Sequence, residues 1–145
     1  MASVLVLNGP NLNLLGEREP GLYGGTGLAE VEARCRALAG ELGLDVAFLQ
    51  SNHEGALIDA VHEARTTRDA IVINAGGYSH TSIALADALR AFPGRIVEVH
   101  VTNVHRREPF RHHSHIATIA DAVLCGCGVL GYELALRFLG ATPPA

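Results

Sequence analysis

Five short apolar runs alternate along this chain with segments of helical periodicity, and this alternation limits the possible folds more than any other feature. The runs cover residues 4–7, 45–49, 70–73, 96–101 and 122–124, and the periodic segments cover residues 28–42, 57–65, 82–92 and 130–139. Because the runs are apolar without strict alternation, they are typical of strands buried on both faces of a sheet. The sequence therefore predicts an α/β fold, a flavodoxin-like doubly wound sheet of five parallel strands in the order 2-1-3-4-5.

Length and composition predict a single catalytic domain over residues 1–145, with a short tail at residues 141–145. A net charge of −4 offers no basic face for nucleic acid or for an anionic membrane. No run approaches the roughly 18 apolar residues of a membrane span, and the start lacks the pattern of a signal peptide. Cys35, Cys125 and Cys127 are an odd, sparse set that does not form a disulfide framework. We therefore expect a cytoplasmic protein without nucleic-acid or membrane partners.

Polar residues gather where the first, third and fourth predicted strands end. Residues 8–13 follow the first strand, residues 74–82 follow the third, and residues 103–113 follow the fourth. In doubly wound sheets, ligands bind beyond the carboxyl ends of the strands at the point where the strand order reverses. The three segments are therefore predicted to line one pocket.

Glu98 and His100 interrupt the apolar fourth strand. They are two residues apart and so point to the same face of the sheet. A buried glutamate is costly unless it is paired. Two interpretations remain open: a structural ion pair at the strand end, or an imidazole that Glu98 orients for proton donation.

Residues 16–25 form a long, glycine-punctuated connection after the first strand, which is typical of a mobile lid. Arg18 and Tyr23 are its reactive side chains, although loop residues of these types are commonly solvent-exposed. A free phenol has a pKa of about 10, so roughly 0.1% is ionised at pH 7. A neighbouring arginine lowers such a pKa by about 1–3 units, enough to make a usable general base.

These segments closely resemble the type II 3-dehydroquinate dehydratases, also called type II dehydroquinases. The resemblance covers residues 4–139 and is carried by matching motifs in the same order. The motifs are Asn8-Gly-Pro-Asn-Leu-Asn-Leu-Leu-Gly16, Arg18-Glu-Pro20, Tyr23-Gly24, Gln50-Ser-Asn-His-Glu-Gly55, Ile73-Asn74, His80-Thr-Ser82, Glu98-Val-His100, Asn103-Val-His105, Glu108 and Phe110-Arg-His-His-Ser114.

The resemblance implies anti elimination of water from 3-dehydroquinate through an enolate, giving 3-dehydroshikimate. By that match Tyr23 is the base, Arg18 favours its ionised form, and Asn11 holds a water at the enolate oxygen. His100, oriented by Glu98, is the acid that protonates the departing hydroxyl.

The same resemblance implies how the substrate is held. It assigns the carboxylate to Asn74 and the backbone N–H groups of Val101 and Thr102, and the ring hydroxyls to His80 and Arg111. It also implies a homo-oligomer, a dodecamer of four trimers, in which Asp87 reaches a neighbouring subunit's pocket. The spacing of Ile83, Ala86 and Leu89 predicts the buried stripe of the helix that carries Asp87.

Five positions depart from the family pattern. Ala75 stands where the family usually has proline, Val101-Thr102 replaces a common Ile-Ser, Ala86 replaces an arginine of many members, and Pro109 replaces a common glutamate. The first predicts a looser turn after the third strand, and the changes at 86 and 109 bear on subunit contacts. None is a proposed catalytic group.

Several other signals have simpler structural interpretations. Residues 126–131 match G-x-G-x-x-G, but the following strand and acidic residue of a dinucleotide site are lacking, so close helix packing is favoured. The C-x-C pair does not have zinc spacing, and no carboxylate cluster accompanies the histidines at 112, 113 and 115. At the second helix, Asn52 is the expected N-cap and Glu54 suits the helix dipole. We expect neither metal nor cofactor.

Two rival functions use the same fold. A flavin- or nucleotide-binding module requires a phosphate-cradling loop after the first strand, whereas residues 8–13 contain no serine or threonine and include a proline without an N–H. A non-catalytic assembly protein predicts loss of Tyr23, Arg18 or His100, all of which are present. All eleven basic residues other than histidine are arginine, so a lysine Schiff base is impossible.

Overall fold

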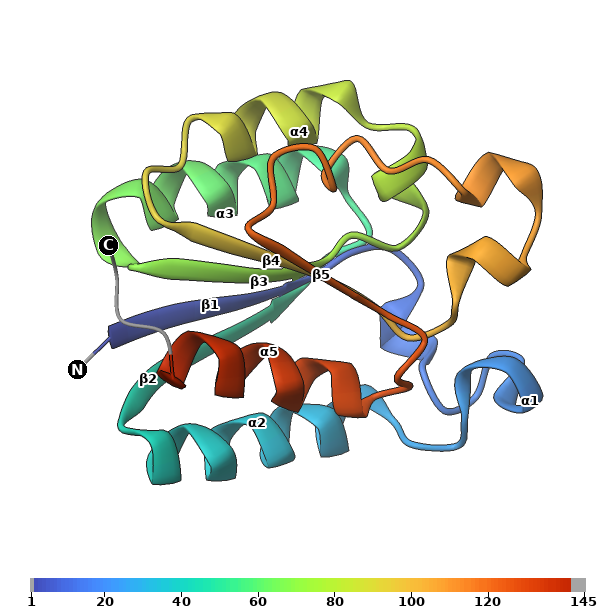
Figure 1. Ribbon diagram of the computed structural model, residues 1–145, viewed down its shortest axis with the longest axis horizontal. Coiled ribbons are helices and arrows are strands. Elements are labelled where there is room, and N and C mark those ends of the chain that lie inside the picture. The colour runs from blue at the N-terminus through green and yellow to red at the C-terminus, as the bar shows by residue number, and fades with distance from the viewer. Residues whose placement is uncertain (1, 142–145) are drawn as a thin grey trace.

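The computed structural model describes residues 2–141, which form a five-stranded parallel sheet with helices on both faces (Figure 1). The strands are β1 (Ala2–Asn8), β2 (Leu44–Gln50), β3 (Ala70–Asn74), β4 (Arg95–His100) and β5 (Ala122–Cys125). All neighbouring pairs are parallel, in the order β2-β1-β3-β4-β5. The predicted fold class and strand order are therefore confirmed.

The helices agree with the sequence pattern in number and place, with differences at their ends. They are α2 (Leu28–Leu42), α3 (Glu54–Thr67), α4 (Ile83–Arg90) and α5 (Leu130–Ala141), and a single turn, α1 (Pro20–Tyr23), lies in the predicted lid. Val101 lies beyond β4 and not within it. Ala141 belongs to α5 and not to a tail, and the rest of the predicted tail, residues 142–145, lies outside the described residues.

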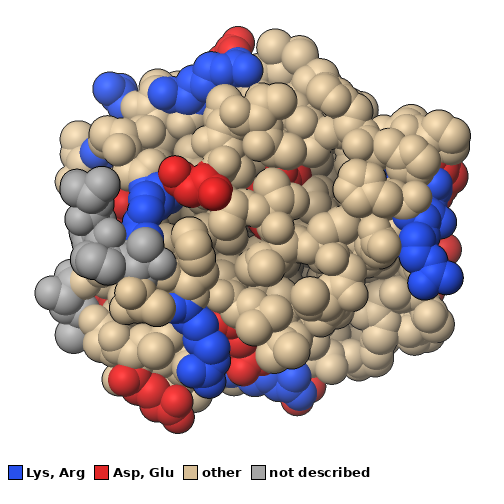
Figure 2. All heavy atoms as spheres, in the orientation of Figure 1, with Lys and Arg blue, Asp and Glu red and all other residues tan. Residues whose placement is uncertain are grey.

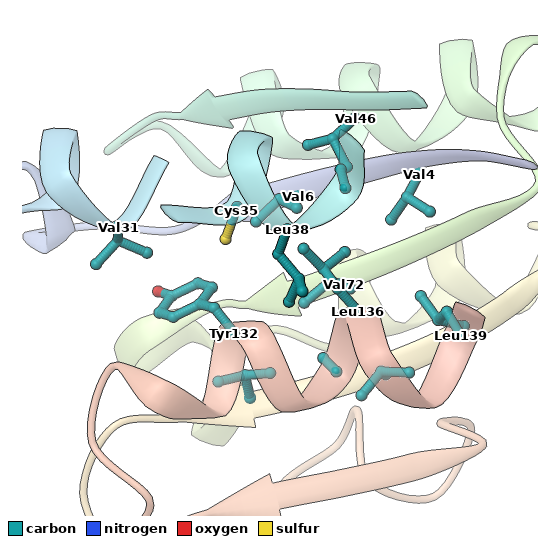
Figure 3. Packing of buried hydrophobic residues seen from close by; sticks show 14 of the residues in the cluster. Val4, Val6, Val31, Cys35, Leu38, Val46, Val72, Tyr132, Leu136 and Leu139 are labelled. Atoms are coloured by element: carbon teal, nitrogen blue, oxygen red, sulfur yellow. The ribbon is translucent and has the colours of Figure 1, made fainter. Parts of the chain in front are cut away.

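Alternation along the strands divides the core into two layers. In β1, Val4 and Val6 face the layer covered by α2 and α5, whereas Leu5 and Leu7 face the layer covered by α3 and α4. Figure 1 shows these two helix pairs on opposite sides of the sheet. Figure 3 shows the first layer, in which Tyr132 of α5 packs among aliphatic side chains. Because both faces are covered, the ends of the strands are left to form a pocket.

One local prediction about helix geometry was wrong, and a second was right for two residues, Ala86 and Leu89, and wrong for Ile83. The N-cap of α3 is His53, and the Asn52 side chain instead accepts a hydrogen bond from the backbone N–H of Asn11, 3.0 Å away. In α4 the buried positions are Leu85, Ala86, Ala88 and Leu89, whereas Ile83 is 56% exposed. Ile83 begins the helix one residue after the Ser82 cap, where its side chain points outward from the fold.

Charged side chains are scattered over the left and lower parts of the face in view and gather again at its right-hand edge (Figure 2). Figure 2 shows no continuous basic surface on the face in view, but it does show arginines beside carboxylates at the right-hand edge. In Figure 1 that edge holds the segments that follow β1 and β4. No helix among the described residues is both long enough and apolar enough to cross a bilayer.

Candidate active site

A pocket of about 140 Å³ opens at the carboxyl ends of β1, β3 and β4, where the sequence predicted it. Its walls come from the segments after these three strands and from the predicted lid. Of the residues proposed from the sequence, it brings together Asn11, Arg18, Tyr23, Asn74, His80, His100, Val101, Thr102 and Arg111. Glu98 lies behind His100, and Asp87 lies elsewhere.

The floor of the pocket depends on a close approach between the ends of β1 and β3. A Cβ atom on Gly9 would lie 2.3 Å from the carbonyl oxygen of Ala75, so only glycine fits at that position. Asn11 adopts a left-handed conformation with φ of 69°, which asparagine tolerates better than most residues. This turn places Asn11 at the pocket wall. Ala75, the departure from the family's proline, is fully buried and leads directly into a 3-10 helix, Gly76–His80.

Glu98 and His100 form a buried pair. The Nε2 atom of His100 lies 2.5 Å from Oε2 of Glu98, and the two side chains are 7% and 0% exposed. The Ser114 hydroxyl, in the segment between β4 and β5, lies 2.6 Å from the same carboxylate oxygen. The Ser114 oxygen accepts the backbone N–H groups of Ile116 and Ala117, so its single hydrogen is donated to Glu98. Oε2 is therefore an acceptor, and Nε2 of His100 donates a hydrogen to it.

His80 closes one side of the pocket beside His100. Its Nδ1 atom lies 2.8 Å from the backbone carbonyl of His113, which can only accept, so Nδ1 carries the hydrogen. The rings of His80 and His100 are stacked with centroids 6.1 Å apart. Burial lowers the pKa of His80, and the neighbouring charges of His100 and Arg111 lower it further against the opposing effects of the bond to His113 and of Glu98. A neutral His80 with Nδ1–H leaves Nε2 as an acceptor for a ligand hydroxyl.

Tyr23 lies between two arginines. Nη1 of Arg107 donates to the Tyr23 phenolic oxygen at 2.8 Å and also to the Thr102 hydroxyl at 3.3 Å. The guanidinium carbon of Arg18 lies 5.1 Å from the centre of the Tyr23 ring. Sequence reasoning assigned Arg18 to this tyrosine and missed Arg107, whose only sequence signal is its place in a basic stretch after β4.

The remaining predicted residues differ in position. Val101 and Thr102 are 7% and 9% exposed, directly after β4. Arg111 lines the pocket and bonds Glu108 at 3.1 Å. Asp87 is on the exposed face of α4 and pairs with Arg90 at 2.9 Å, so within one subunit it does not contribute to the pocket.

Besides Arg107, two residues to which sequence reasoning gave no role contact the proposed site residues. Ser114 bonds Glu98, as described, and Tyr132 bonds the side chain of Asn74 from within the core, at 2.9 Å. Periodicity marks Tyr132 as a core residue of α5, but nothing local marks its polar contact. Within residues 2–141, no group of three or more His, Cys, Asp or Glu side chains is placed to hold a metal ion.

The fold is a doubly wound α/β sheet. Beyond its strand ends, one small polar pocket is lined by a histidine paired with a glutamate and by a tyrosine bonded to an arginine. This arrangement defines an enzyme that acts on a small molecule. Comparison with known families identifies it more closely. The family described as dehydroquinase class II matches residues 2–140. The chain therefore belongs to the class II, or type II, dehydroquinases.

Individual relatives agree with this assignment. A 3-dehydroquinate dehydratase of Chelativorans sp. (strain BNC1) is 58% identical over 140 residues, which cover 96% of this chain and 97% of the relative. Another, from Methylobacterium radiotolerans, is 59% identical over 137 residues, covering 94% and 92%. The crystal structure of the type II dehydroquinase from Propionibacterium acnes superposes with a TM-score of 0.95 at 42% identity, with 98% of each chain covered.

Proposed function

We propose that this enzyme is a 3-dehydroquinate dehydratase that converts 3-dehydroquinate to 3-dehydroshikimate by anti elimination of water. The observation that carries the mechanism is that the Tyr23 phenol, bonded to Arg107, and the His100 imidazole, bonded to Glu98, line the same pocket. A proton acceptor and a proton donor thus face one bound ligand. Membership of the class II family supports the substrate.

Tyr23 is the general base of this proposal. Its ionised oxygen removes the C2 proton, and the electrons of the C–H bond move into the ring carbonyl to form an enolate. The hydrogen bond from Arg107 favours negative charge on the Tyr23 oxygen, and the nearby Arg18 guanidinium acts in the same direction. Asn11, at the pocket wall, holds the water that stabilises the enolate oxygen.

His100 is the general acid. As the enolate collapses, the C1–O bond breaks, a double bond forms between C1 and C2, and the departing hydroxyl takes a proton from His100 and leaves as water. Because Nε2 is bonded to Glu98, the proton that is transferred comes from Nδ1. The buried carboxylate stabilises the imidazolium before transfer and fixes the ring orientation afterwards. Exchange with solvent then returns Tyr23 and His100 to their starting states.

Substrate binding uses the rest of the pocket wall. Asn74 and the backbone N–H groups of Val101 and Thr102 hold the carboxylate. His80 accepts a ring hydroxyl through Nε2, and Arg111 binds a second hydroxyl. The pocket contains several hydrogen-bond donors for an acid of this kind, but residues 8–13 form no serine- or threonine-rich phosphate loop, which disfavours a nucleotide.

Assembly is part of the same proposal. Asp87 is exposed on α4, outside the pocket of its own subunit, which leaves it available to a neighbouring subunit in a trimer. Four such trimers would make the dodecamer. Ala86 is 1% exposed within the subunit, so this departure from the family alters the subunit core and not an exposed contact.

The test is turnover of 3-dehydroquinate, followed by the ultraviolet absorbance of the conjugated product. Tyr23→Phe is expected to lose at least about a hundredfold in kcat while still binding substrate, since only the proton acceptor is removed. Tyr78→Phe is the matched control, because the Tyr78 hydroxyl bonds the backbone of Asn52 and not a pocket residue. A Tyr23→Phe enzyme that keeps more than roughly a tenth of the wild-type rate would rule out this base.

A further inference from the structure

A line of four hydrogen bonds runs under the pocket from β2 to the turn after β3. Asn8 donates through Nδ2 to the carbonyl of Leu49 at 3.2 Å, and Tyr132 donates its hydroxyl hydrogen to Oδ1 of Asn8 at 2.7 Å. Asn74 donates through Nδ2 to the Tyr132 oxygen at 2.9 Å and accepts the backbone N–H of Gly76 at 3.2 Å. Asn8, Asn74 and Tyr132 are 0%, 4% and 0% exposed, so water is largely excluded from these bonds.

Backbone groups at its two ends fix the direction of every bond in this line. The Leu49 carbonyl can only accept, so Asn8 must turn its amide nitrogen toward it and its oxygen toward Tyr132. The single phenol hydrogen is then committed to Asn8, and the Tyr132 oxygen can only accept from Asn74. Burial raises the pKa of Tyr132 well above its usual value, so the phenol keeps this hydrogen throughout the working pH range.

One donor of the Asn74 side chain remains. Its oxygen is occupied by Gly76 and one amide hydrogen by Tyr132, which leaves the second amide hydrogen. Asn74 lines the pocket, so this hydrogen is the group that the side chain can offer to a ligand. In the reversed orientation the amide would present its oxygen, which repels a carboxylate.

The first turn of α5 explains how a core tyrosine reaches the site. Gly131 immediately precedes Tyr132, and a Cβ atom there would lie 3.1 Å from Val99 of β4, so glycine lets the start of α5 approach the sheet closely. Figure 3 shows the Tyr132 hydroxyl pointing away from Leu136 and Leu139 of the same helix. The glycine motif at residues 126–131 thus has a structural purpose in this fold without any dinucleotide.

We propose that Tyr132 is a positioning residue for ligand binding, which holds the Asn74 amide so that its free N–H faces the carboxylate of the substrate. This inference rests on the proposed function for the identity of the ligand. The simpler alternative is that the Tyr132 hydroxyl only satisfies buried polar groups and stabilises the core. The two differ in whether its removal changes ligand affinity through Asn74.

The experiment compares Tyr132→Phe with Tyr78→Phe and the wild type. Removing the Tyr132 hydroxyl leaves the Asn74 side chain held only by the backbone N–H of Gly76, so we expect KM to rise roughly tenfold or more while kcat stays within roughly threefold. Calorimetry should show the same loss for 3-dehydroquinate but not for an analogue without the carboxylate. In an Asn74→Ala background, Tyr132→Phe should have no further effect on KM, because the residue through which it acts is gone.

A second measurement needs no turnover. In the ¹⁵N-labelled free enzyme, the amide hydrogen of Asn74 bonded to Tyr132 should exchange slowly with solvent, and Tyr132→Phe should remove this protection. If the wild-type enzyme does not turn over 3-dehydroquinate, the proposed function is refuted. Slow exchange of the Asn74 amide hydrogen would in that case still show that its hydrogen bond to Tyr132 exists. The positioning role is overturned if a folded Tyr132→Phe enzyme binds 3-dehydroquinate with unchanged affinity. It is also overturned if Tyr132→Phe changes KM equally in the wild-type and Asn74→Ala backgrounds.

Discussion

The contact between Ser114 and Glu98 gives a prediction whose size can be worked from the structure. Glu98 is fully buried, and its Oε2 atom accepts from His100 at 2.5 Å and from Ser114 at 2.6 Å. Its other oxygen, Oε1, has no hydrogen-bond partner among the described residues. Ser114→Ala therefore leaves a buried carboxylate with His100 as its remaining partner.

The expected cost follows from the charge of that acceptor. Hydrogen bonds to charged groups contribute about 1.5–3 kcal/mol. Ser114 is half-buried, so water can partly replace its hydroxyl, and we expect the free energy of unfolding to fall by about 2 kcal/mol. For a chain of this size that lowers Tm by about 4–8 °C. Because Glu98 is then held by His100 alone and orients the imidazole less firmly, kcat should fall about tenfold.

Urea unfolding followed by circular dichroism suits this chain, which contains no tryptophan. Ser51→Ala is the matched control, since the Ser51 hydroxyl also accepts a backbone N–H two residues later, that of His53 at 3.0 Å, but contacts no buried charge. The control therefore measures how much of the stability lost by Ser114→Ala comes from the backbone N–H groups that its hydroxyl oxygen no longer accepts. If both variants lose the same stability and Ser114→Ala keeps its kcat, the carboxylate does not depend on Ser114.

Three further predictions concern pH, the lid and the assembly. Burial holds the pKa of His80 below its ordinary 6.5, so as the pH falls the unfolded chain takes up the proton before the folded chain does. The stability that neutral His80 contributes at pH 7 is therefore lost as the pH falls below about 6.5. His80→Gln should therefore flatten the change in the free energy of unfolding between about pH 7.5 and 5.5, and an unchanged slope would contradict the burial effect. Saturating substrate should slow tryptic cleavage after Arg18, and equal cleavage rates with and without substrate would argue against lid closure. Trimers reassembled from a mixture of Asp87→Asn and Tyr23→Phe chains should be more active than either parent, because some pockets then combine both intact residues; no gain, with mixed oligomers verified by native mass spectrometry, excludes a shared site.

The sheet could be predicted because its information is local. Continuous apolar runs such as 70–73 differ from helical stripes in their short length, and the order of strands and helices then permits few topologies. The pocket could be located because ligands bind beyond the carboxyl ends of the strands in sheets of this kind, and the sequence shows where each strand ends. Helix starts were less predictable: α3 begins at Glu54 after His53, while Asn52 bonds Asn11 from a distant turn. Its amide is used for tertiary contact and not for capping.

The partners of the site residues were the part that sequence could not supply. Arg107 meets Tyr23 across 84 positions and Tyr132 meets Asn74 across 58, and neither distance corresponds to a helical or strand period. The motif resemblance named the groups that face a ligand. It included Ser114 in a motif without assigning it a role and gave no sign of Tyr132, because a hydroxyl side chain has the same sequence signature whether it orients a site residue or only satisfies its own polar atom.

The contacts divide the pocket into a fixed side and an adjustable side. On the fixed side, His100 and Asn74 each belong to buried lines of hydrogen bonds that end on backbone groups, so their orientation is set before any ligand arrives. On the other side, Arg18 and Tyr23 are carried by an exposed segment in which Glu19 has a left-handed φ of 43°, an uncommon conformation outside glycine. The proposed reaction needs a carboxylate and a hydroxyl to be bound precisely, and it also needs the ring to enter and leave the pocket. A pocket with one fixed side and one adjustable side meets both needs. In the proposed mechanism the acid and the ligand anchors can be rigid because only the base has to move, and Arg107, bonded to both Tyr23 and Thr102, is the contact through which the adjustable side is joined to the fixed one.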